Sequence, residues 1–181
     1  RFLQSLPFAL TGAQRRALAD VDRDLAESRP MMRLVQGDVG CGKTVVAAAA
    51  AARAVGSGLQ AALMAPTELL AEQHAKNFER WFNALDIPVT LITGSLPART
   101  RRNALAAVAN GDINIVVGTH ALFQESMEFA RLGLVIVDEQ HRFGVHQRLS
   151  LRDKGARGGQ LPHQLIMTAT PIQRTLAMTA Y

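Results

Sequence analysis

The sequence has very little cysteine and no long apolar run, and each of these absences excludes a class of protein. Cys41 is the single cysteine in 181 residues, so an intrachain disulfide is excluded and a reducing interior is expected. No stretch of roughly 18 or more apolar residues is present, and the amino terminus lacks the basic-then-apolar layout of a signal peptide. We therefore expect a cytoplasmic protein with no membrane partner.

Charged residues are also sparse, at 19%, whereas apolar residues make up 48%, which indicates a globular rather than a disordered chain. The 20 Lys and Arg exceed the 15 Asp and Glu. A positive surface attracts phosphate backbones, so a polyanionic partner is favoured, although an ordinary basic protein has the same composition. The length fits one α/β domain, and the initial Arg and final Tyr181 suggest a piece of a longer protein.

Short apolar runs alternate with helical stretches along the chain. The runs predict strands at 32–36, 59–65, 89–93, 113–117, 134–138 and 164–168. The stretches between them predict helices at about 12–27, 43–56, 68–84, 97–109 and 146–153. Continuous apolar strands are typical of a parallel sheet covered on both faces. The alternation predicts one α/β domain with a doubly wound, mostly parallel sheet, and sites at the carboxyl ends of its strands.

The clearest chemical motif is GDVGCGKT (37–44), which fits G-x-x-x-x-G-K-[ST] between a predicted strand and a predicted helix. Its glycines let backbone amides point at phosphate oxygens, and the helix adds its positive end. Lys43 is expected to reach the β- and γ-phosphates, and Thr44 to ligate Mg²⁺. The ATP-binding residues predicted here are Gly37, Asp38, Val39, Gly40, Cys41, Gly42, Lys43 and Thr44. Cys41 is interpreted as a small loop residue rather than a catalytic thiol.

A pair of acids, Asp138 and Glu139, follows the apolar run 134–137. An aspartate at a strand end suits Mg²⁺, directly or through water, opposite Thr44. Glu139 is then placed to orient or deprotonate the attacking water. An ordinary polar turn after a strand needs no paired acids, so the pair together with a complete phosphate loop predicts nucleotide hydrolysis.

The motifs together resemble those of superfamily 2 helicases and translocases. DEQH (138–141) resembles motif II, APTELLAEQ (65–73) motif Ia, TGS (93–95) motif Ib, GTHAL (118–122) motif Ic and TATP (168–171) motif III. The string DEQHRFGV (138–145) is most similar to the RecG-type ATP-dependent translocases of branched DNA. Mfd-type transcription-repair translocases are similar but usually read DEEH. The resemblance implies a RecA-like P-loop NTPase fold over residues 1–181, as the first of two motor lobes.

The resemblance also implies roles for residues outside the phosphate loop. Gln14 would read adenine, although Thr11 and Gln14 also form a capping-box pattern. Four residues would contact the DNA backbone, although the first two of them are equally good helix caps: Thr67, Ser95, Thr119 and His120. The implied catalytic residues are Lys43, Asp138, Glu139 and His141, and His141 would link the ATP site to Thr168 and Thr170.

The cofactors implied are ATP and Mg²⁺, and the partners are branched or forked DNA, a second RecA-like lobe and a wedge domain of a longer chain. Motifs IV to VI are absent from these residues. Because the second lobe would supply arginines to the γ-phosphate, we expect these residues alone to bind nucleotide weakly and hydrolyse it very slowly. Gln173 stands where the RecG-type pattern has proline, which removes a rigid φ near a helix start.

Three alternatives remain open. The first is the matching lobe of an Mfd-type translocase, which flanking domains would distinguish. The second is a small P-loop kinase, which DEQH and TATP argue against. The third is a catalytically idle interaction module, which the intact Lys43, Thr44, Asp138 and Glu139 argue against.

Overall fold

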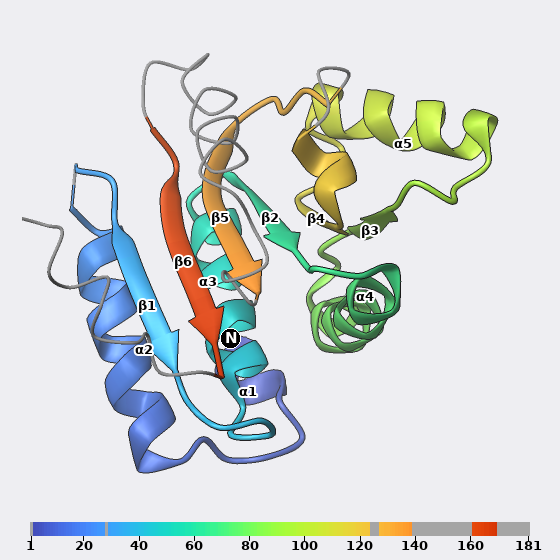
Figure 1. Cartoon of the computed structure of the whole chain (residues 1–181). Helices are drawn as coiled ribbons and strands as arrows, with labels where there is room; N and C mark the ends of the chain where they lie inside the picture. Colours follow the sequence, from blue (N-terminus) through green and yellow to red (C-terminus); the bar gives the residue numbers. More distant parts are fainter. Residues whose placement is uncertain (1, 28, 124–126, 139–160, 170–181) are drawn as a thin grey trace, which may run out of the picture.

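The fold is built on one parallel sheet. A computed structural model describes residues 2–27, 29–123, 127–138 and 161–169. Within these residues the strand order is β1-β6-β5-β2-β4-β3, and each neighbouring pair is parallel (Figure 1). The strands are β1 (Met32–Gln36), β2 (Gln60–Met64), β3 (Val89–Ile92), β4 (Ile115–Gly118), β5 (Leu132–Asp138) and β6 (His163–Thr168). All the predicted strands are confirmed, with small shifts at their ends.

The predicted helices that fall within the described residues are confirmed as well. They are α2 (Gly12–Leu25), α3 (Lys43–Gly56), α4 (Glu68–Phe82) and α5 (Ala98–Asn110). The predicted helix at 146–153 lies outside the described residues. The short elements α1 (Phe2–Ser5), η1 (Asn83–Leu85) and η2 (His120–Phe123) were not predicted. None of the described helices combines the length and apolar character needed to cross a bilayer.

Both faces of the central strands are covered, as the sequence predicts. Alternate residues of β2 point to opposite faces, as they must in a strand. Ala61 and Leu63 join the core cluster that contains residues of α1, α2, α3 and α4. Ala62 and Met64 join a second cluster that contains residues of α5 and η2. Figure 1 shows α2 beside β1, α3 behind the central strands, and α5 next to β3 and β4.

The prediction of strands buried on both faces is wrong for β1. Its residues alternate between exposed and half-buried, and Met32 and Leu34 are 75% and 37% exposed. The central strands β2 and β4 are buried throughout. The difference follows from position, because β1 is an outermost strand of the sheet. Only one of its faces packs on α2, where Arg33 donates to Asp24 at 2.7 Å.

Aromatic rings fix α4 and α1 to each other. Phe78 and Phe82 of α4 are fully buried, and their ring centroids lie 5.6 Å apart. The ring of Phe2 stacks on Phe82 with centroids 4.8 Å apart. A helix as short as α1 is unstable by itself, so its formation depends on this tertiary contact.

Of the two residues for which a helix cap is the alternative role, Thr67 is a cap and Ser95 is not. Thr67 is the N-cap of α4, where its hydroxyl accepts a hydrogen bond from the Leu70 amide at 3.3 Å. Ser95 does not cap α5, because the chain enters that helix at Pro97. The Ser95 amide instead donates to Glu68 Oε1 at 3.2 Å. This bond joins the end of β3 to the first turn of α4.

The edge of the sheet at the amino ends of β1 and β6 depends on a neutral histidine. The Met31 amide donates to Nδ1 of His163 at 2.9 Å, and only an unprotonated Nδ1 can accept that bond. Burial lowers the pKa of His163 from 6.5, and the nearby Asp24 carboxylate opposes this shift.

We expect acid to destabilise the fold through His163. Because its pKa is lowered in the folded state, the unfolded chain binds the proton more readily, so stability is lost as pH falls from 6.5 through the folded-state pKa. Thermal unfolding midpoints measured across pH for the wild type and His163→Asn test this. The asparagine Oδ1 can still accept from the Met31 amide but does not titrate. Parallel pH profiles for the two proteins would contradict the role of His163.

Candidate functional site

The candidate site lies along the edge formed by the carboxyl ends of the strands. Because all pairs are parallel, these ends meet at one edge, where sites of open α/β sheets form. Taken in sheet order, the predicted residues there are the loop 37–42 after β1, Thr168 on β6, Asp138 on β5, Thr67 after β2, Thr119 after β4 and Ser95 after β3. The predicted ATP residues therefore occupy one half of the edge and the predicted DNA residues the other.

The phosphate loop runs from the end of β1 to the start of α3. Gly40 and Gly42 adopt positive φ angles of 82° and 84°, which favour glycine. A Cβ added at Gly37 would lie 2.5 Å from Sγ of Cys41, so the loop closes tightly on itself. This packing agrees with the interpretation of Cys41 as a small loop residue. The Gly37 amide donates to the Thr168 carbonyl at 3.2 Å, which joins the loop to β6.

Lys43 directs its ammonium into the loop. Its Nζ donates to the carbonyls of Gly37 at 2.6 Å and Asp38 at 2.9 Å. A positive charge held inside a curl of backbone, at the first residue of a helix, is the arrangement that binds phosphate oxygens. The residues present therefore fit a nucleoside triphosphate.

Gln14 connects α2 to the phosphate loop. The capping box is confirmed, because Oε1 of Gln14 accepts from the Thr11 amide at 2.9 Å and the Gln14 amide donates to the Thr11 hydroxyl at 3.2 Å. Its Nε2 also donates to the Cys41 carbonyl at 3.0 Å. An amide nitrogen has two hydrogens and an amide oxygen two lone pairs, so each atom keeps bonding capacity for an adenine edge.

Asp138 ends β5 as predicted, and its carboxylate has a partner that sequence reasoning missed. Nε2 of His74 on α4 lies 2.7 Å from Oδ2 of Asp138. A histidine inside the buried stripe of an amphipathic helix was the available signal, because such positions are normally apolar. No group of three or more His, Cys, Asp or Glu gathers at metal-binding distance among the described residues. The predicted Mg²⁺ site would combine Thr44 and Asp138 with phosphate oxygens of the nucleotide, as is common for this ion.

The four predicted DNA contacts differ in exposure. Thr67, Ser95 and His120 are exposed, whereas Thr119 is only 2% exposed. The buried hydroxyl of Thr119 has no hydrogen-bond partner among the described residues. Direct contact with a phosphate through that hydroxyl is therefore disfavoured in this conformation. The predicted residues Glu139, His141 and Thr170, and the substituted position Gln173, lie outside the described residues.

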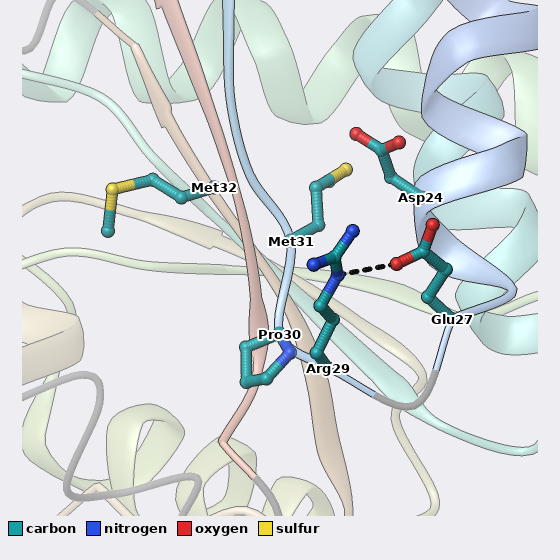
Figure 2. A pocket seen from close by; sticks show the side chains of 6 residues that line it. All are labelled: Asp24, Glu27, Arg29, Pro30, Met31 and Met32. Carbon is teal, nitrogen blue, oxygen red and sulfur yellow. Dashed lines mark hydrogen bonds and ion pairs between the residues drawn. The ribbon is translucent and has the colours of Figure 1, made fainter.

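A small hollow of about 160 Å³ lies away from these strand ends. It is lined by Asp24, Glu27, Arg29, Pro30, Met31 and Met32. Figure 2 shows Arg29 paired with Glu27, at 2.6 Å, beside the start of β1. The hollow is at the opposite edge of the sheet from the phosphate loop and takes no part in the candidate site.

Comparison with known proteins agrees with this arrangement. The family model described as DEAD/DEAH box helicase matches residues 11–179. The chain belongs to the DEAD/DEAH box helicase family. Among solved structures, a DEAD-box helicase Mss116 bound to single-stranded RNA matches with a TM-score of 0.72 at 18% identity, covering 93% of this chain and 37% of that chain. That likeness concerns the fold alone.

Within the helicase family, the chain is similar to RecG proteins along its whole length. It is 61% identical to the ATP-dependent DNA helicase RecG of Haemophilus influenzae and 54% identical to that of Bacillus subtilis, over 100% of this chain and 26% of each relative. A structure of RecG bound to a three-way DNA junction matches with a TM-score of 0.84 at 43% identity, covering 99% of this chain and 24% of that one. The chain thus spans about a quarter of these relatives.

We expect Gly42→Ala to destabilise the chain more than Gly40→Ala. Both substitutions force a side chain into positive φ, which costs roughly 1–2 kcal/mol. A Cβ at Gly40 meets nothing within 4 Å, whereas at Gly42 it would lie 2.1 Å from Nε2 of Gln14. Displacing the Gln14 side chain breaks the hydrogen bonds that its Oε1 makes with Thr11 and its Nε2 with Cys41. We therefore expect a further loss of about 1 kcal/mol in the free energy of unfolding. Urea unfolding of both variants measures the difference.

The Gln14→Ala background is the control, because it removes the side chain that a Cβ at position 42 would contact. In that background the two glycine substitutions should have equal effects. A difference that persists without the Gln14 side chain would show that the contact is not its cause.

Proposed function

We propose that these residues form the ATP-binding motor lobe of a RecG-type helicase that remodels branched DNA in the cytoplasm. The observation that carries the proposal is the division of one sheet edge between a phosphate loop and a set of predicted DNA contacts, in a chain 61% identical to RecG. The remaining length of such a protein would include a second RecA-like lobe and a wedge domain.

In this proposal the chain's own groups hold the triphosphate. The loop amides and the Lys43 ammonium bind phosphate oxygens, and Gln14 contacts the adenine edge from the position it already holds beside Cys41. A bound Mg²⁺ would neutralise phosphate charge, held by Thr44 and Asp138. Glu139 would orient or deprotonate the attacking water.

DNA would bind along the other half of the edge. The exposed hydroxyls of Thr67 and Ser95 and the ring of His120 would contact the backbone phosphates without reading sequence. The net charge of +5 favours such a partner. Nucleotide state would reach this half through His141, Thr168 and Thr170. The bond between the Gly37 amide and the Thr168 carbonyl supports that route, because it ties β6 directly to the phosphate loop.

The other functions considered from the sequence are less well supported. The relatives named RecG match this chain along its whole length, which does not favour an Mfd-type lobe. A small kinase is less well supported because the DEAD/DEAH box helicase model matches residues 11–179, which is nearly the whole chain.

The proposal predicts two separable activities. The 181 residues alone should bind ATP in a titration with a fluorescent nucleotide, and Lys43→Ala should weaken binding roughly 10- to 100-fold by removing a charge-assisted hydrogen bond. Their steady-state ATPase rate should stay at least ~10³ below that of the full-length protein stimulated by branched DNA, because arginines from a second lobe are absent.

Each part of the prediction can fail independently. Strong DNA-stimulated turnover by the 181 residues alone would contradict the shared active site. Failure of the wild-type protein to bind ATP, or equal binding by Lys43→Ala, would contradict the nucleotide site itself. Lys76, an exposed lysine on α4, supplies the matched control: Lys76→Ala should leave ATP affinity unchanged.

A further inference from the structure

We infer that His74 is a positioning residue that holds the Asp138 carboxylate in place for the bound nucleotide and its cation. This inference rests on the proposed function, because it concerns the same ATP site. Asp138 ends β5, and His74 lies in the second turn of α4, the helix that follows β2. Since β2 and β5 are neighbours in the sheet, the helix that follows β2 begins near the end of β5, and its His74 ring reaches the carboxylate.

The contact is short and shielded from water. Nε2 of His74 and Oδ2 of Asp138 are 2.7 Å apart, and the two side chains are only 10% and 14% exposed. An ionised carboxylate can only accept, so the ring N–H donates. The bond fixes the rotation of the carboxyl group and leaves Oδ1 as the oxygen for a cation. Groups that orient a metal ligand in this way are typical of the outer shell of metal sites.

A purely structural role explains this histidine poorly. It lies in the buried stripe of α4 with Ala71, Ala75, Phe78 and Phe82, where an apolar side chain would pack without any polar cost. Its Nδ1 is buried and has no hydrogen-bond partner among the described residues. The buried Nδ1 is therefore a polar cost that packing alone does not explain. The other ring nitrogen, Nε2, is bonded to the carboxylate that is predicted to hold a cation.

The helix that carries His74 is itself held at its amino end. Glu68 in its first turn accepts the Ser95 amide at 3.2 Å, which anchors α4 to the chain after β3. Thr67 caps the same turn. The ring is therefore presented to Asp138 from a helix fixed by polar bonds at one end and by buried phenylalanines at the other. His74 orients the carboxylate as part of this rigid unit.

The pair His74→Gln and His74→Asn tests the inference in the full-length protein. The glutamine amide nitrogen can reach the place of Nε2, whereas the asparagine amide is too short. ATP affinity is titrated at a series of free Mg²⁺ concentrations and in EDTA. For His74→Asn we expect half-saturating Mg²⁺ to rise by about 10- to 100-fold, as for other groups that orient metal ligands. For His74→Gln we expect less than about one third of that rise, and for both variants metal-free ATP affinity should be unchanged.

His163→Gln is the control, because it alters a histidine whose ring accepts from the Met31 amide at the opposite end of the strands. It should leave the Mg²⁺ requirement unchanged. Wild-type Mg²⁺ dependence in His74→Asn would overturn the positioning role, and so would equal losses in the Asn and Gln variants, which would assign the effect to ring packing. If the wild-type protein itself binds no ATP, the proposed function fails instead. Thermal scans of each variant verify that the fold is retained.

Discussion

Parallel strand pairing is the constraint on which the rest of the structure depends. It brings every strand's carboxyl end to one edge, so residues that follow different strands meet without being close in sequence. The strand order then decides which of them become neighbours. Because β6 and β5 insert between β1 and β2, the phosphate loop lies beside Thr168 of β6, and Asp138 of β5 comes next. The segments after β2, β4 and β3 follow in the same direction. Both halves of the candidate site result from this one arrangement.

The local elements of this fold could be predicted because their signals are local. Each strand is a continuous apolar run, and α3 begins at Lys43 immediately after the phosphate loop. The strand order, in contrast, depends on tertiary packing that no run of residues encodes alone. The same reason explains why α1 is missed, since it is fixed by the ring of Phe2 on Phe82. It also explains the unexpected exposure of Met32, which lies in the outermost strand β1.

The candidate site divides in the same way. The phosphate loop is contiguous in sequence, so its geometry follows from its glycines and its place between β1 and α3. His74 and Asp138 are separated by 64 positions, and their contact requires β2 to pair with β5. A serine near a helix start is a good cap in most contexts, but the cap alternative for Ser95 fails because Pro97 already fixes the entry to α5. Its amide is used by Glu68 instead.

The energetics of the His74 and Asp138 pair argue that it is kept for orientation rather than stability. Burying two polar groups removes hydration from both, and replacing such pairs with apolar residues of similar size is often neutral or stabilising. The surrounding stripe of alanines and phenylalanines would accept that replacement. What an apolar residue could not supply is a donor aimed at Oδ2, and without one the carboxylate at the end of β5 is free to rotate. A lone buried carboxylate with no fixed partner is a poor ligand, because it must lose that freedom each time it binds. The histidine removes the freedom in advance, and it does so from the helix whose first residues border the other half of the edge.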